Sequence, residues 1–254
     1  MRVVSWNLAR NTTSRSNAIH DRAWHFLAAL DPDVALVQEA VPPSWIQSAW
    51  DIVKAPTHYW GSAILAKPAL RLTALSPERE THWDRQGYLA SGTVTLPDAR
   101  SLFLGSVHAP LMKALSAEYL AGYDPEAIKL PSYRTAAYYD VPYAIYKERV
   151  PEHFLVSGDW NISPVLWDQH HSNSHQSEFF DRARQDGWVD CYRQFHSVEG
   201  RTWFRRTDRP YQMDHAFCDP TVALALRSCE IEAYPAEKLR VSDHAALVLE
   251  LEGW

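Results

Sequence analysis

The stretch HFLVSGDWNISP, residues 153–164, starts as a buried strand and ends in polar side chains. Its apolar run stops at a glycine, which is followed by Asp159, Trp160 and Asn161. Because side chains alternate between the two faces of a strand, we expect Asp159 and Asn161 to face one side and Trp160 to pack on the other. A core strand that delivers a carboxylate and a carboxamide together predicts a site at the rim of a sheet.

The same pattern recurs along the chain. Further ligand-type or proton-transfer residues stand at the ends of predicted strands: Asn7 (VVSWN), Glu39 (VALVQE), His108 (LFLGSVH), Asp214 (before HAFC) and Asp243 with His244 (before AALVLEL). Any one of them would more often be structural, because strands leave the core at their ends. Taken together with Asp159 and Asn161, they indicate one shared rim.

The remaining periodicity predicts a single α/β domain of α+β type over residues 1–254. Its predicted strands are 2–8, 33–40, 61–67, 70–75, 88–96, 101–109, 201–204, 213–218, 224–234 and 245–252, and its predicted helices are 17–30 and 177–187. Several neighbouring strands look antiparallel, and strands outnumber helices. Two packed sheets with helices outside is the expected architecture.

Composition excludes several classes of protein. The chain has 254 residues, 46% hydrophobic and 22% charged, which is ordinary for one globular domain. No apolar run approaches the roughly 18 residues of a membrane span. The net charge of −6 argues against a protein that coats nucleic acid, but not against an enzyme that meets phosphates locally. Three cysteines without C-x-x-C spacing and no secretory signal predict buried thiols in a cytoplasmic protein.

The rim residues restrict the chemistry. Carboxylate and amide oxygens without a cysteine or histidine cluster suit Mg²⁺ or Mn²⁺. Histidines beside carboxylates suit proton transfer near neutral pH. A divalent ion, a His–Asp pair and amide donors are the parts needed to attack a phosphate ester with water.

The order WN, QE, SVH, GDWN, YQMDHAF and VSDHA resembles the endonuclease/exonuclease/phosphatase superfamily, from residue 3 to about 251. The resemblance is to its pancreatic-deoxyribonuclease-like and apurinic-endonuclease-like metal-dependent phosphoesterases. It implies a four-layer sandwich of two mixed β-sheets flanked by helices, which agrees with the strand pattern.

The resemblance also implies roles for the rim residues. Glu39 would be the principal metal ligand, with Asn7 beside it and Asp243 near the metal. His108 and Asn161 would hold phosphate oxygens, and Asn7 would also contact substrate. Asp159 would lie close to the nucleophilic water, and Asp214 would polarise His244. Either Asp159 or His244 could be the base, because the sequence does not decide between them.

Other segments have two interpretations each. The loop RTWFRRTDRPYQMD offers Arg205, Arg206 and Trp203 as a substrate-binding rim, or a solvated turn. The tyrosine-rich segment 111–150 is a substrate wall or an aromatic satellite core. The acidic residue that would support His108 is not evident, although Glu80 and Asp84 are candidates. His215 is expected to pack, since it points away from the face of Asp214, and HHSNSH (170–175) to be a solvated loop.

The sequence therefore favours a Mg²⁺- or Mn²⁺-dependent phosphodiesterase that hydrolyses P–O bonds by in-line attack of water, with a nuclease acting on DNA or RNA as the first hypothesis. The alternative is an enzyme acting on a small-molecule or lipid head-group phosphoester. A binding module that keeps the fold without turnover is the third hypothesis. The oligomeric state is left open.

Overall fold

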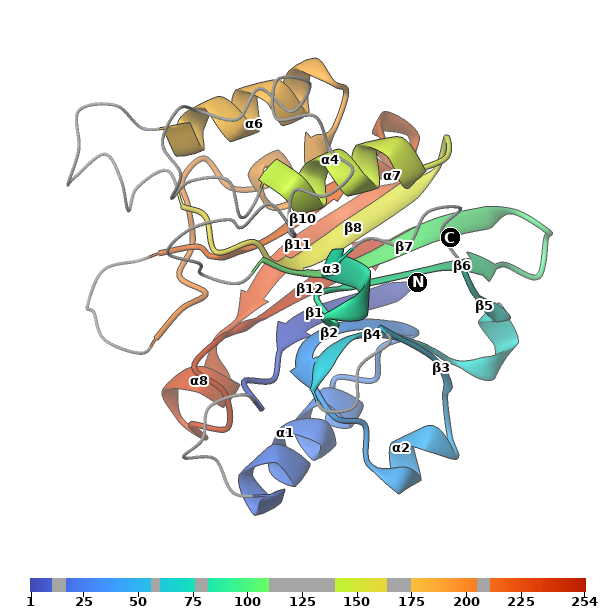
Figure 1. The fold of residues 1–254 in the computed structure, drawn as a ribbon, viewed down its shortest axis with the longest axis vertical. Coiled ribbons are helices and arrows are strands. Elements are labelled where there is room, and N and C mark those ends of the chain that lie inside the picture. The colour runs from blue at the N-terminus through green and yellow to red at the C-terminus, as the bar shows by residue number, and fades with distance from the viewer. Residues whose placement is uncertain (11–16, 56–59, 76–81, 110–139, 164–174, 205–210) are drawn as a thin grey trace.

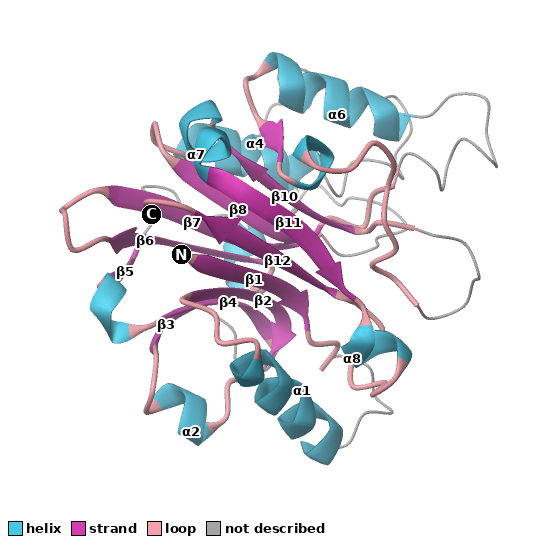
Figure 2. Ribbon diagram, turned by 180° about the vertical axis from the view of Figure 1, so that it is seen from behind, coloured by secondary structure: helices cyan, strands magenta, loops and turns pink. Residues whose placement is uncertain are grey.

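The computed structural model describes residues 1–10, 17–55, 60–75, 82–109, 140–163, 175–204 and 211–254. Its strands form two six-stranded sheets (Figures 1 and 2). The first sheet has the order β11 (Leu226–Glu232), β12 (Ala246–Leu251), β1 (Arg2–Asn7), β2 (Val34–Ala40), β4 (Gly61–Ala66), β3 (Asp51–Lys54). The second has the order β5 (Leu72–Ala74), β6 (Leu89–Thr95), β7 (Ser101–His108), β8 (Phe154–Asp159), β10 (Asp214–Cys218), β9 (Val189–Asp190).

Helices cover the outer faces of both sheets. In Figure 1, α1 (Asn17–Ala29), α2 (Ser44–Gln47) and α8 (Tyr234–Glu237) lie below the first sheet, and α4 (Asp140–Arg149), α6 (His175–Gln185) and α7 (Pro220–Ala225) lie above the second. The remaining described helices are η1 (Pro68–Leu70), α3 (His82–Arg85) and η2 (Tyr192–Gln194). The predicted four-layer sandwich of two mixed β-sheets is confirmed.

Alternation along the strands divides the core into three clusters. In β1, Val3 joins the cluster between the sheets, whereas Val4 and Trp6 pack under α1 with Trp24. On the far side, Phe154 and Val156 of β8 join an aromatic cluster under α4 and α6. Central strands are buried on both faces, which explains why β2 and β4 read as continuous apolar runs.

Each sheet contains one parallel pair of strands. β1 pairs in parallel with β2, so that Asn7 lies opposite Gln38. β7 pairs in parallel with β8, so that His108 lies opposite Asp159. The other strand pairs described are antiparallel. Because β1 contacts β8 and β2 contacts β7 across the sandwich, the carboxyl ends of the two parallel pairs meet at one rim.

Some predicted elements were wrong. Residues 201–204 form no strand but one isolated bridge between Trp203 and His244. The strand predicted from 224 begins at Leu226, because Asp219 caps a short helix by accepting from the backbone N–H groups of Thr221 and Val222. The short strands β3 and β9 were not predicted. Most of the tyrosine-rich segment lies outside the described residues.

Cys191, Cys218 and Cys229 are buried free thiols, as predicted, and burial raises the pKa of the Cys191 and Cys229 thiols. No described helix combines the length and the apolar character that crossing a bilayer requires.

Candidate active site

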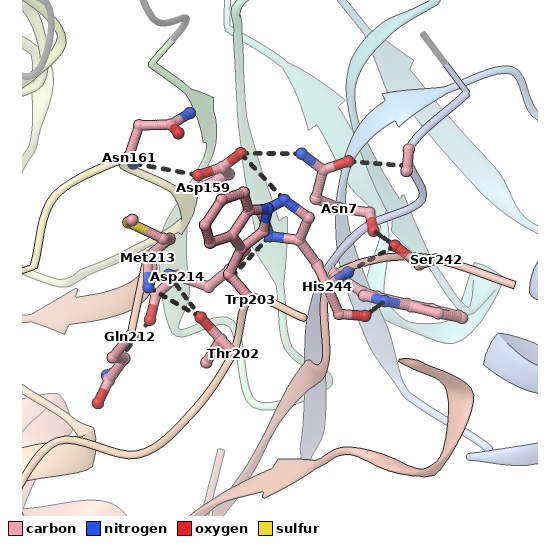
Figure 3. A network of polar contacts seen from close by, with 12 residues as sticks. Asn7, Asp159, Asn161, Thr202, Trp203, Gln212, Met213, Asp214, Ser242 and His244 are labelled. Carbon is pink, nitrogen blue, oxygen red and sulfur yellow. Dashed lines mark hydrogen bonds and ion pairs between the residues drawn. The ribbon is translucent and has the colours of Figure 1, made fainter. Parts of the chain in front are cut away.

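Asp159 lies at the centre of the rim, at the end of β8. Its Oδ2 accepts a hydrogen bond of 2.9 Å from Asn7 Nδ2, and its Oδ1 accepts one of 3.0 Å from the Asn161 backbone N–H (Figure 3). The same Oδ2 lies 3.8 Å from His244 Nε2 and 3.9 Å from His108 Nε2. Two imidazoles thus face one carboxylate from opposite sheets.

The backbone around Asp159 departs from a regular strand. Trp160 is fully buried in the aromatic cluster, as the alternation predicted. Asn161, however, has left the strand and adopts φ 51°, and its Nδ2 donates to the Ala109 carbonyl at 2.8 Å. Asparagine tolerates this left-handed conformation better than most residues. Asn161 therefore reaches the rim through a turn and not through strand periodicity.

Gly158 is required by a close approach of two strands. A Cβ at this position would overlap the carbonyl oxygen of Val107 and lie 2.9 Å from Gln38 Nε2. Gln38 itself is buried and donates to Ser106 Oγ at 2.9 Å, which links β2 to β7 beneath the rim. The glycine before Asp159 thus lets the two sheets close directly under the site.

Glu39 projects from an irregularity in β2. The pairing of β2 with β4 shifts register between Val37 and Ala40, and Glu39 adopts φ 46°. Such a conformation is strained for a residue other than glycine or asparagine and is often found at functional sites. The Glu39 carboxylate lies 3.4 Å from His108 Nε2 and accepts a hydrogen bond of 3.2 Å from Asn7 Nδ2.

His244 is held by Asp214. Its Nδ1 lies 2.9 Å from Asp214 Oδ2, and both side chains are buried. The hydroxyl of Thr202 accepts from the backbone N–H groups of Met213 and Asp214, at 2.9 and 3.1 Å, and so fixes the start of β10. The hydroxyl of Ser242 donates to the Asn7 carbonyl at 2.6 Å and accepts from His244 N–H at 3.0 Å.

Sequence reasoning did not assign roles to Thr202 and Ser242, although each belongs to a quoted motif. Their position as hydroxyl residues next to the predicted site residues is the feature of the sequence that could have indicated their role in holding the backbone.

Charge at the rim changes the protonation of two groups. Burial raises the pKa of Asp159 from 3.8 to about 6, although the positive charge of His244 opposes this. Burial by itself would lower the pKa of His244, but the charges of Asp214 and Asp159 outweigh it and raise this pKa from 6.5 to about 10. His244 is therefore an imidazolium near neutral pH, while Asp159 changes charge just below it.

The donor set fits a divalent cation. Glu39, His108 and Asp159 each offer a ligand atom within 4.8 Å of the others, and Asp159, Asp214 and His244 form a second such group. Asn7 directs Nδ2 toward the carboxylates, while its Oδ1 accepts from Ala9 N–H at 2.8 Å.

Because an amide nitrogen does not bind Mg²⁺, Glu39 is the leading candidate ligand, and Asn7 would have to turn its amide to act as one. The half-buried Asp243 belongs to neither group, although its charge also raises the pKa of His244.

Other candidate residues lie elsewhere. His215 is buried on the far face of β10, where its Nε2 lies 2.9 Å from the Ile162 carbonyl and its ring contacts Phe180 and Phe217, as expected for a packing residue. Trp203 is half-buried and meets His244 through the backbone bridge. Arg205, Arg206, Glu80 and residues 170–174 of the HHSNSH run lie outside the described residues. Asp84 does not support His108, because its carboxylate forms two 2.7 Å hydrogen bonds with Arg149.

Residues 4–244 match the sequence model of the endonuclease/exonuclease/phosphatase family. No curated protein matches the chain by sequence.

Solved structures with a similar fold include a 3′-5′ exonuclease from Neisseria meningitidis, with a TM-score of 0.67, 17% identity and 100% of both chains covered. An AP endonuclease from Archaeoglobus fulgidus has a TM-score of 0.65 and 15% identity, with 99% of both chains covered. TDP2 from D. rerio, complexed with a single-strand DNA product, has a TM-score of 0.64 and 16% identity, with 98% of this chain and 97% of that chain covered.

Proposed function

The chain belongs to the endonuclease/exonuclease/phosphatase family and is a phosphoester hydrolase, and from this premise we propose that it is a Mg²⁺-dependent phosphodiesterase that acts as a nuclease on DNA or RNA. The observation that carries this proposal is the position of Asp159 Oδ2 between the Nε2 atoms of His108 and His244, at 3.9 and 3.8 Å. A carboxylate between two imidazoles can hold a water molecule while both rings contact phosphate oxygens.

The roles follow from which atoms face the centre. Asp214 accepts from His244 Nδ1, and Asp159 faces Nε2, so carboxylates stand at both ring nitrogens and favour the doubly protonated ring. His244 then stabilises a phosphate oxygen, and Asp159 orients the attacking water and takes its proton. His108 and Asn161 hold the other phosphate oxygens. The choice of base that the sequence left open is thus proposed to fall on Asp159.

A divalent cation would be held by Glu39, with Asn7 and Asp243 contributing, and when bound it supplies positive charge that offsets the charge developing on the phosphate. In its present orientation the Asn7 amide donates to both Glu39 and Asp159 through Nδ2, and turning the amide to offer Oδ1 to the cation would exchange these two hydrogen bonds for a metal contact. Solved structures of the same fold include a 3′ phosphatase from Neisseria bound to a product DNA hairpin, which supports a nucleic-acid substrate for this chain.

The test is a screen of plasmid DNA, single-stranded DNA, RNA and bis(p-nitrophenyl) phosphate with Mg²⁺, Mn²⁺ or EDTA. We expect metal-dependent cleavage of at least one nucleic acid. Asp159→Ala and His244→Ala should each lower kcat by on the order of 10²–10⁴. Asp190→Asn is the matched control, because Asp190 also faces a histidine, His215 at 4.0 Å, but on the far side of β10. Wild-type rates in both alanine variants would contradict the catalytic assignment.

A second set of variants identifies the substrate class. We propose that Arg205, Arg206 and Trp203 contact a nucleic-acid strand beside the scissile bond. Replacing both arginines with alanine should raise KM for DNA and leave turnover of the small diester unchanged. Cleavage of the small diester alone would favour a small-molecule or lipid head-group substrate.

A further inference from the structure

The two histidines of the rim are oriented by different means. His244 is fixed by the 2.9 Å contact of its Nδ1 with Asp214. The Nδ1 of His108 is buried and has no hydrogen-bond partner among the residues that the structure describes. Asp84, the described acidic candidate for that partner, is bound to Arg149. Among the described residues, carboxylates therefore face His108 only at Nε2, where Glu39 lies 3.4 Å away, and none holds the ring at Nδ1.

Two aromatic side chains contact this ring. Trp60 meets it with ring centroids 5.8 Å apart and planes at 62°, and Tyr88 meets it at 5.8 Å and 74°. Both contacts have the edge-to-face geometry that aromatic pairs favour. Both aromatic residues are only half-buried, and the His108 ring that they contact is 7% exposed. We call Trp60 and Tyr88 the aromatic clamp.

Backbone contacts place the clamp relative to His108. The Tyr88 carbonyl accepts from His108 N–H at 2.9 Å and from Ser62 Oγ at 2.8 Å. Ser62 N–H also donates to the Gly87 carbonyl at 2.8 Å, which joins β4, and with it Trp60 two residues earlier, to the chain that enters β6. Trp60, Tyr88 and His108 thus lie on three chain segments, and the three hydrogen bonds just described join these segments directly.

We propose that the aromatic clamp positions His108 for catalysis, in the place of the carboxylate that positions His244. Rotation about the Cβ–Cγ bond would turn Nε2 away from Glu39 and Asp159, and the clamp restricts that rotation by contact with the ring. Trp60 and Tyr88 are positioning residues, since they act through His108. The inference rests on the proposed function, because it takes His108 to contact the phosphate.

The experiment compares Trp60→Ala and Tyr88→Ala with the ring-preserving variants Trp60→Phe and Tyr88→Phe, using bis(p-nitrophenyl) phosphate and DNA. We expect the alanine variants to lower kcat by on the order of 10- to 100-fold on both substrates, with KM and melting temperature unchanged, because small misplacements of catalytic groups have effects of this size. The phenylalanine variants should restore kcat. In a His108→Ala background, removal of either clamp residue should cost no more than about twofold.

Three results would overturn the proposal: unchanged kcat in the alanine variants, an equal fall of kcat in the His108→Ala background, or an effect confined to KM for DNA, which would make the clamp a substrate contact. A second readout does not need turnover. The ¹H–¹³C ring resonances of His108 should shift or broaden in the alanine variants and stay near wild type in the phenylalanine variants. If the wild-type protein cleaves no phosphoester, the proposed function fails, while these resonances still decide whether the clamp orients the ring.

Discussion

Replacing Asp214 with asparagine removes the negative charge beside His244 but keeps a side chain of nearly the same shape. The variant keeps an oxygen near His244 Nδ1 but removes the charge, which together with the hydrogen bond is the main cause of the raised pKa of His244. We expect kcat to fall by on the order of 10³–10⁴, the loss seen when an aspartate that orients a catalytic histidine is neutralised.

The same variant should change how stability depends on pH. Because the pKa of His244 is raised from 6.5 to about 10 in the folded state, its stabilising contribution is complete below about pH 6.5 and is lost as the pH rises through about 10. Integrated from pH 6 to pH 10, the contribution lost is roughly 4 kcal/mol. In Asp214→Asn, burial lowers this pKa with less opposition, so most of that pH dependence should disappear.

The assay is urea unfolding at several pH values between 6 and 10 in EDTA, with kcat measured separately on a chromogenic phosphodiester. Subtracting the variant's free energy of unfolding from that of the wild type removes the titration of unrelated groups. Asp190→Asn again serves as the control, and it should keep both the activity and the pH profile. The reasoning is refuted if Asp214→Asn retains kcat within tenfold, or if its stability falls with pH as steeply as that of the wild type.

Three further changes test the rest of the rim. Asp159→Asn should abolish turnover and yet raise the free energy of unfolding at pH 8 in EDTA by about 1–3 kcal/mol. The reason is that the buried carboxylate, with its pKa raised to about 6, destabilises the folded state above that pH. A variant less stable than the wild type would contradict this. Glu39→Gln should raise the Kd for Mn²⁺ by at least about tenfold in calorimetry, since it removes a ligand charge, and unchanged affinity would remove Glu39 from the metal site. Gly158→Ala should destabilise the fold by about 3 kcal/mol or more through overlap with the Val107 carbonyl. Gly187→Ala, whose Cβ would meet open space, should cost only about 1–2 kcal/mol in urea unfolding, because the φ of 81° at this position is unfavourable for alanine.

The local pattern predicted much of the second sheet. Alternation placed Trp160 in the core and Asp159 at the rim, and the end of β8 was found to within a residue. It failed at Asn161, which reaches the rim with φ 51° after the strand has ended. It also failed at residues 201–204, where a strand-like composition forms only the bridge from Trp203 to His244. In both cases a contact between distant segments, and not the local propensity, decides the backbone.

The sequence by itself determined which side chains stand at the ends of buried strands, because burial imposes a period of two and polar groups must leave the core where a strand stops. Only the tertiary structure decided that β1–β2 and β7–β8 are the parallel pairs whose ends meet, since strand pairing depends on contacts between residues far apart in the chain. The same holds for the orientation of His108. The sequence offers Asp84 as an acidic neighbour of His108, whereas in the folded chain Trp60 and Tyr88 pack against the ring and Asp84 pairs with Arg149.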